Sequence, residues 1–162
     1  MKSLLRRIVA LAALTLMTGL AFAGDNPKAV VEAYMAAWNT HDADKAGSYF
    51  ADTGEYYDVT VGTSQKGRDA ARDNVIKVFI GAVPDLKWVM DGEPIVGADG
   101  GIAFQWTFSG TNTGAWDPKT PATNKAFRFK GVSFVRIKDG KITYQGDYYD
   151  ALGFQKQLGW IQ

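Results

Sequence analysis

The chain has 162 residues, with 18 Lys and Arg against 17 Asp and Glu, one His and no Cys. A formal net charge of +1 gives no basic surface of the kind that nucleic acids require, so we expect no nucleic-acid partner. The absence of Cys excludes disulfide bonds and thiol catalysis, and one His without Cys does not make an ordinary zinc site. The sequence also has no Gly-rich phosphate-binding motif, and we expect neither a metal nor an organic cofactor.

The first 23 residues have the pattern of a signal peptide. Residues 1–7 carry three basic side chains, residues 8–20 are mostly apolar, and residues 21–23 read Ala-Phe-Ala, which suits a signal peptidase. The apolar run is shorter than the roughly 20 residues of a membrane span, although an uncleaved anchor is the alternative. Cleavage leaves one domain, residues 24–162, with a net charge of −2, and we expect it to be periplasmic or secreted and free of the membrane.

The first half of the mature chain is predicted to be mainly helical. Asn26 and Pro27 form a cap and first turn, and apolar residues then recur at helical spacing through 30–38. A second, short helix is expected over 42–50. A third is expected over 69–83, before a proline that ends it.

A turn and a short strand are predicted between the second and third helices. Residues 51–54 read Ala-Asp-Thr-Gly, which is typical of a turn, and residues 55–59 have the composition of a strand. Residues 62–67 are then expected to form a loop before the third helix.

In the second half, the apolar residues alternate with a period of two, which predicts strands. Asp139-Gly140 is a strong hairpin signal, and Asp150 is a suitable cap for a terminal helix. The expected strands are 86–90, 102–108, 126–138 and 141–149. Helices followed by hairpin-connected strands predict an α+β domain, with a curved antiparallel sheet wrapped on the helices.

Several segments, in order, resemble one known family. Residues 34–42, Tyr-Met-Ala-Ala-Trp-Asn-Thr-His-Asp, resemble the opening of nuclear-transport-factor-2-like domains. Residues 134–142 and 147–159 resemble the SnoaL-like polyketide cyclase (ester cyclase) branch of the ketosteroid-isomerase-like superfamily. The resemblance covers nearly the whole mature chain. It implies a cone-shaped α+β barrel in a single domain, a pocket for a small apolar ligand, and a homodimer formed through the sheet.

Asp147 is the first candidate catalytic residue. In SnoaL-like cyclases an Asp at the matching position acts as general acid and base in an intramolecular aldol closure. The chemistry is reasonable because burial raises the pKa of a carboxyl group, which can then take a proton from carbon and return it to an alkoxide. The alternative is a solvated Asp on the outward face of a strand.

Asp58 and Tyr34 are the second and third candidates, because they match a proton-shuttling Asp and an oxyanion-hole Tyr of ketosteroid isomerases. A phenol donor opposite a carboxylate base suits enolisation. The alternatives are a turn residue for Asp58 and a core aromatic for Tyr34. Val132 matches the place of those isomerases' second acid, which argues against true ketosteroid isomerase activity.

The remaining candidates are ligand-binding residues. Many cyclases have His-Trp-Asp in the last strand where this chain has Gln145-Gly-Asp, and Gln145 can still hydrogen-bond a ligand. Three aromatic residues, Trp38, Phe104 and Trp106, are expected to line the pocket. Asp150 and His41 are assigned structural roles at helix ends.

Three classes of function remain open, and one of them is an interaction module that dimerises through its sheet. The other two involve a small-molecule ligand. One is a cofactor-independent cyclase or isomerase that moves a proton on an apolar carbonyl compound. The other is an exported binder of an apolar metabolite. A buried Asp147 facing a cavity favours the enzyme, whereas a cavity lined by apolar side chains alone favours the binder.

Overall fold

The computed structural model describes residues 26–162, and the predicted signal peptide 1–23 lies outside these residues. The helical elements are α1 (Pro27–Asn39), α2 (Ala43–Gly47), α3 (Arg68–Ala71), the π-helical segment η1 (Arg72–Ile76), α4 (Lys77–Ala82) and α5 (Ala151–Leu158). The strands are β1 (Phe50–Asp58), β2 (Gln65–Lys66), β3 (Lys87–Val96), β4 (Gly101–Thr111), β5 (Ala126–Lys138) and β6 (Lys141–Tyr149).

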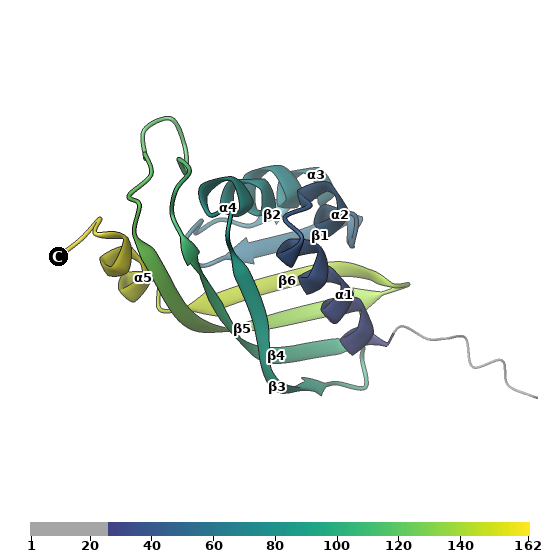
Figure 1. Ribbon diagram of the computed structural model, residues 1–162. Coiled ribbons are helices and arrows are strands. Elements are labelled where there is room, and N and C mark those ends of the chain that lie inside the picture. Colours follow the sequence, from purple (N-terminus) through teal and green to yellow (C-terminus); the bar gives the residue numbers. More distant parts are fainter. Residues whose placement is uncertain (1–25) are drawn as a thin grey trace, which may run out of the picture.

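The six strands form one curved sheet in the order β2-β1-β6-β5-β4-β3, and the sheet does not close into a full barrel. Helices α1 to α4 cover its concave face, and α5 packs against β5 near one end (Figure 1). The predicted single α+β domain is confirmed. None of the helices within residues 26–162 has the length and apolar character needed to cross a bilayer.

Helix α1 begins where its sequence provides a cap. The Asn26 side chain accepts a hydrogen bond from the Ala29 backbone N–H at 3.2 Å, and Pro27 occupies the first turn, where no backbone donor is needed. The helix buries one face against the sheet through Val31, Tyr34, Met35, Ala37 and Trp38. This face supplies Trp38 to the interior of the cone.

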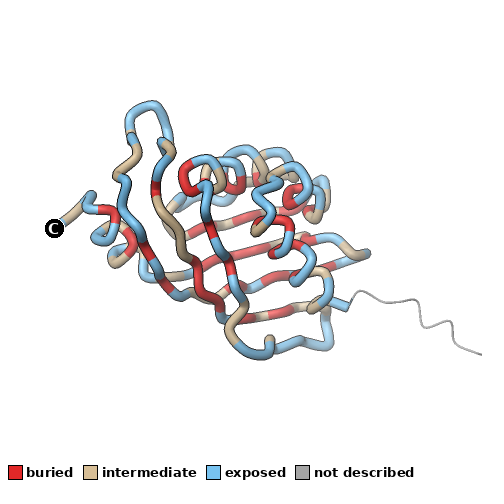
Figure 2. The backbone as a smooth tube through the Cα atoms, viewed as in Figure 1, coloured by how far each residue is buried: buried red, intermediate tan, exposed pale blue. Residues whose placement is uncertain are grey.

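The strands alternate between buried and exposed positions, so one face of the sheet meets the core (Figure 2). In β5, Phe129 and Ser133 are buried while Phe134 is half exposed. In β6, Asp147 is buried and the next residue, Tyr148, faces outward. The two-residue period of a strand thus turns Asp147 inward, and the predicted strands 126–138 and 141–149 have the bounds of β5 and β6.

The prediction for β1 is wrong at its start. The strand begins at Phe50, and the turn expected at 51–54 is an irregularity inside it, where the register with β6 shifts. The pairing is parallel, and Ile142 donates its backbone N–H to the Tyr49 carbonyl at 2.8 Å. Gly54 permits the approach, since a Cβ there would lie 2.7 Å from the Ile142 carbonyl oxygen. Composition alone does not reveal such a long-range pairing.

The helix predicted over 69–83 is present but is not uniform. It runs through α3, η1 and α4, and η1 carries the wider π-type hydrogen bonding. Short π segments inside helices are frequent near functional sites. The segment that follows places Phe79 over the concave face of the sheet, where it contacts Trp38 and Phe108.

Candidate active site

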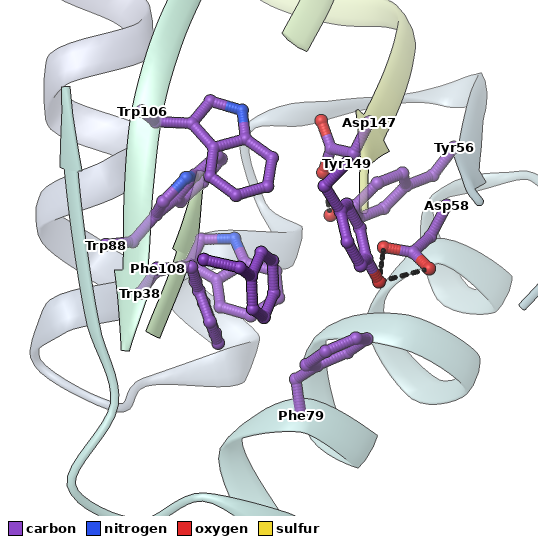
Figure 3. A pocket seen from close by; sticks show the side chains of 10 residues that line it. Trp38, Tyr56, Asp58, Phe79, Trp88, Trp106, Phe108, Asp147 and Tyr149 are labelled. Carbon is purple, nitrogen blue, oxygen red and sulfur yellow. Dashed lines mark hydrogen bonds between the residues drawn. The ribbon is translucent and has the colours of Figure 1, made fainter. Parts of the chain in front are cut away.

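A cavity lies between the helices and the concave face of the sheet. Its walls are aromatic and acidic side chains: Trp38, Tyr56, Asp58, Phe79, Trp88, Trp106, Phe108, Phe129, Asp147 and Tyr149. The rings of Trp38, Trp88, Trp106 and Phe108 form one side and Phe79 lies below, while the oxygen atoms of Asp58, Asp147 and the two tyrosines gather on the other side (Figure 3). The volume open to the centre of a water molecule is about 20 Å³, which is little more than one water needs.

Asp147 lies on β6 opposite Ser133 of β5 and is 4% exposed. Its Oδ1 accepts a hydrogen bond from the Ser133 hydroxyl at 2.5 Å, and its Oδ2 accepts one from the Tyr56 hydroxyl at 2.7 Å. The Gln145 amide donates to both oxygens, at 3.1 and 3.0 Å. These donors from three strands fix the carboxyl group at the cavity wall.

Burial raises the pKa of Asp147 from 3.8 to about 7, because the interior disfavours the charged form. The hydrogen bond from Ser133 lowers this pKa, the negative charge of Asp58 raises it, and the bonds from Tyr56 and Gln145 lower it. The balance leaves a carboxyl group that is partly ionised near neutral pH. That is the range in which one group can both accept and donate a proton.

Asp58 lies at the end of β1 and is also buried. Its Oδ1 accepts hydrogen bonds from the Thr60 backbone N–H at 2.8 Å and the Thr60 hydroxyl at 2.5 Å. The Tyr149 hydroxyl lies 3.0 and 3.1 Å from its two oxygens (Figure 3). Burial raises the pKa of Asp58, while these donors lower it. Asp58 therefore fits both interpretations of the sequence: it is a turn residue bonded to Thr60, and its carboxyl group lines the cavity.

Trp106 connects the aromatic wall to Asp147. Its indole Nε1 donates to the Ser133 hydroxyl at 2.8 Å, and the same hydroxyl donates to Asp147. Gly131, which pairs with Trp106 across β4 and β5, leaves the space for the indole, since a Cβ there would lie 2.3 Å from the ring. A side chain at position 131 would therefore displace a ring that orients the hydroxyl beside the carboxyl group.

The structure brings some of the predicted site residues together and separates others. Asp147, Asp58, Trp38 and Trp106 line the cavity. Gln145 and Phe104 do not: Gln145 is fully buried and directs its amide at Asp147, and Phe104 packs beside Trp88. The structure thus places Gln145 behind the carboxyl group, where it holds Asp147, and a contact with ligand needs a rearrangement.

Tyr34 is fully buried behind the cavity and is not among the residues that line it. Its hydroxyl has no hydrogen-bond partner within residues 26–162. Burial raises its pKa well above 10, and the negative charge of Asp147 adds to this effect. Tyr34 therefore stays a neutral phenol, packed edge-on against Trp88 with ring centres 5.6 Å apart.

Among the residues that contact the carboxyl groups, the side chains of Tyr56, Ser133, Tyr149 and Thr60 were not predicted. Strand alternation contains the signal that identifies two of them. Tyr149 lies two residues from Asp147 and Tyr56 two residues from Asp58, so each shares a face with its acid. Ser133 is identified only when the register between β5 and β6 is known.

The structure also shows the contacts of Val132, Asp150 and His41, which were not predicted to be site residues. Val132 pairs with the outward-facing Tyr148, so the inward position beside it is Ser133. Asp150 caps α5 by accepting the Gly153 backbone N–H at 2.8 Å. The His41 ring lies 3.1 Å from the Leu86 carbonyl. Within residues 26–162, no three of His, Asp and Glu gather closely enough to hold a metal ion.

Comparisons with known proteins agree with this architecture. The family model for SnoaL-like polyketide cyclases matches residues 28–158. No curated protein sequence matches the chain.

Solved structures with the same fold include a hypothetical protein from Catenulispora acidiphila with a ketosteroid isomerase-like fold, in complex with trimethylamine. It is 22% identical with a TM-score of 0.67, over 80% of this chain and 92% of that one. A candidate polyketide cyclase from Pseudomonas putida is 21% identical with a TM-score of 0.69, over 83% and 98% of the two chains. A candidate SnoaL-like polyketide cyclase from a Jannaschia species is 14% identical with a TM-score of 0.71, over 84% and 93%. The chain belongs to the SnoaL-like polyketide cyclase family.

Proposed function

We propose that this protein is a cofactor-independent enzyme of the cyclase or isomerase type, in which Asp147 transfers a proton on an apolar, carbonyl-containing ligand. The observation that carries the proposal is the carboxyl group itself. It is buried at a cavity wall, held by Ser133, Tyr56 and Gln145, and its pKa is raised to about 7. A perturbed carboxyl group in an apolar pocket is a common mark of acid–base catalysis.

In the proposed reaction, the carboxylate of Asp147 accepts a proton from the carbon next to the ligand carbonyl. The electron pair of the C–H bond forms a C=C bond, and the carbonyl π pair moves to oxygen to give an enolate. Where the ligand has a C=C bond β,γ to the carbonyl, the enolate is a dienolate, and protonated Asp147 returns the proton to its γ-carbon as the double bond moves into conjugation, which isomerises the ligand. In a cyclisation the enolate carbon attacks a second carbonyl, and the proton goes to the new alkoxide.

The rest of the site supports this role in two ways. The negative charge of Asp58 raises the pKa of Asp147 and so strengthens it as a base. The aromatic wall of Trp38, Trp88 and Trp106 offers apolar surface to the ligand and excludes water. The small free volume means that ligand entry requires side chains to move, and Phe79 lies at the edge of the cavity.

Deuterium exchange tests the proposal without knowledge of the natural substrate. Acetonaphthone, a neutral bicyclic methyl ketone, is incubated with protein in D₂O, and loss of its methyl proton signal is followed by NMR. We expect catalysed exchange that falls at least about 100-fold in Asp147→Asn. Asp139→Asn, which changes an exposed Asp in the β5–β6 hairpin, is the matched control and retains exchange. Equal exchange rates in the two variants contradict the proposal.

A non-catalytic binder is the second candidate, because six of the ten residues that line the cavity are Trp or Phe. A binder takes up acetonaphthone with the same affinity in wild type and Asp147→Asn and catalyses no exchange. The enzyme is favoured because Asp147, Asp58, Tyr56 and Tyr149 place four oxygen-bearing side chains on the same cavity.

We propose that the protein forms a homodimer through the outer face of its sheet. Exposed apolar side chains gather there on β3, β5 and β6, including Val89, Phe134 and Tyr148, with exposed fractions of 53%, 51% and 40%. The Phe134 and Tyr148 rings pack 6.0 Å apart. Analytical ultracentrifugation of Phe134→Glu should then give a monomer. A monomeric wild type, or a variant that remains dimeric, contradicts the proposal.

We also propose that the protein is exported, from the basic, apolar and small-residue order of residues 1–23. Expression with the full leader, followed by fractionation and N-terminal sequencing, tests this. We expect the envelope or medium fraction to contain a chain that begins at Gly24. A chain in the cytosol that retains its leader contradicts export.

A further inference from the structure

A second hollow lies beside the cavity, between α4, the 112–125 loop and the C-terminal segment. We call it the outer groove. The volume open to the centre of a water molecule is about 520 Å³ there, against about 20 Å³ in the cavity. The cavity alone has room for little beyond a carbonyl group and its neighbouring carbon, whereas the groove is large enough for a ring system.

Phe79 separates the two spaces, because its side chain lines both. On the cavity side its ring packs against Phe108 with centres 5.9 Å apart, and on the groove side against Trp116 at 5.1 Å. Phe79 belongs to α4, which directly follows the π-helical segment η1. Phe79 is thus the one residue that the linings of the groove and the cavity share within the described part of the chain.

A second connection runs through Thr60. Thr60 lines the outer groove, and its hydroxyl lies 2.5 Å from Asp58 and 2.6 Å from the Tyr149 hydroxyl. Asp58 and Tyr149 both line the cavity. Thr60 therefore lies between the groove and the two groups on the acidic side of the cavity.

The lining of the groove selects the kind of molecule. Trp116, Phe154 and Trp160 form an edge-to-face cluster with ring centres 5.8 to 6.1 Å apart, and Trp160 is 39% exposed. Such rings bind flat apolar surface well. Among the described residues, those that line the groove and the cavity include no Lys, Arg or His, and Asp117 contributes a negative charge. An anionic ligand therefore finds no counter-ion in either space.

We infer that the outer groove is a second ligand subsite, which holds the uncharged, ring-bearing end of the molecule whose carbonyl end reaches Asp147, with Phe79 as the movable partition. The inference rests on the proposed function, because it assigns the cavity to the reacting carbonyl. It adds a size requirement: a ligand long enough to occupy both spaces binds more tightly than one that fills the cavity alone.

Two probes that differ by one fused ring, acetophenone and acetonaphthone, test the inference. Dissociation constants are measured by ligand-observed NMR for wild type, Trp160→Ala, Val61→Ser and Leu152→Ala. Val61 lines the groove, whereas Leu152 is an exposed apolar residue of α5 outside it. We expect acetonaphthone to bind wild type and Leu152→Ala about tenfold more tightly than acetophenone, from the apolar area of the extra ring.

In Trp160→Ala and Val61→Ser the preference for acetonaphthone over acetophenone should fall below about threefold, while the affinity for acetophenone stays within about twofold of wild type. A preference that is unchanged in both variants overturns the inference. So does a change in sedimentation of Trp160→Ala with ligand affinity unchanged, because the groove is then a contact between copies of the chain.

The failures of the two proposals are distinguishable. Asp147→Asn should lose deuterium exchange yet keep the tenfold preference for acetonaphthone, since Asp147 is not part of the groove. If exchange is catalysed but the preference is absent, the subsite fails and the proton-transfer function stands. If the preference is present without exchange in wild type, the groove binds ligand and the catalytic proposal fails.

Discussion

Asp58 and Asp147 lie opposite each other in the parallel pairing of β1 with β6, and both carboxyl groups line the same cavity. The pairing matters because like charges in a shared space disfavour double ionisation. Asp58 has two backbone donors, from Thr60 and Val61, that support its ionised form, whereas every donor to Asp147 is a side chain. This difference in donors supports the proposed proton-transfer role for Asp147 and an electrostatic role for Asp58.

Removing the charge of Asp58 should lower the pKa of Asp147. Asp58→Asn takes away a negative charge that raises this pKa, so the base form of Asp147 persists to lower pH. The acid limb of the exchange rate against pH should move to lower pH. Asp99→Asn, at an exposed Asp, should leave the profile in place. A shift to higher pH would contradict the electrostatic role.

Removing the hydroxyl of Tyr56 should instead raise the pKa of Asp147. Tyr56→Phe deletes a hydrogen bond that stabilises the carboxylate of Asp147, so its pKa rises and the acid limb moves to higher pH. The free energy of unfolding should fall by about 1–3 kcal/mol, because a buried acceptor loses a partner. Tyr57→Phe, on the opposite face of β1, is the control and should change neither quantity appreciably. Identical pH profiles for the two variants would argue against a direct bond to Asp147.

Gly131→Ala should weaken the site through Trp106. The new methyl group meets the indole ring, which must move, and the Trp106–Ser133–Asp147 chain loses its geometry. We expect about 1–3 kcal/mol of destabilisation, measured by urea unfolding, together with slower exchange. Gly81→Ala is the matched change, because nothing lies within 4 Å of a Cβ there. It should be neutral or stabilising by up to about 1 kcal/mol in helix α4.

Stability should decrease between pH 4 and pH 7. The folded protein holds a proton on Asp147 up to pH about 7, whereas the unfolded chain releases it near 3.8. The stabilisation is complete below pH 3.8 and is lost as pH rises through about 7; the full difference is roughly 4 kcal/mol. Urea unfolding from pH 4.5 to 8 should show a smaller decrease in Asp147→Asn than in wild type. A change in the free energy of unfolding over this range that is the same in wild type and in Asp147→Asn would refute the raised pKa.

Much of the fold could be predicted from sequence because its signals are local. The Asn26-Pro27 cap, the Asp139-Gly140 hairpin and the alternation in β5 and β6 each depend on neighbouring residues. The extent of β1 could not be predicted in the same way. Its first residues pair with β6, some 90 positions away, and the loop-like composition of 51–54 conceals that pairing.

The candidate site could also be predicted only in part. The family resemblance identified Asp147 and Asp58 as candidates, and both line the same cavity in the structure. Gln145 and Ser133 contact Asp147 through bonds that depend on strand register and side-chain direction, which the sequence does not specify. Tyr34 lies four residues before Trp38 on α1, but of the two only Trp38 lines the cavity, because the direction of each side chain depends on how α1 packs on the sheet.

The most direct test of the account is the titration of the Asp147 carboxyl carbon by ¹³C NMR, assigned by its loss in Asp147→Asn. We predict a midpoint near 7, and a deuterium exchange rate on acetonaphthone that rises with pH through the same midpoint. A midpoint near 4, or an exchange rate that does not follow the ionisation of this carboxyl group, would contradict the assignment of Asp147 as the base.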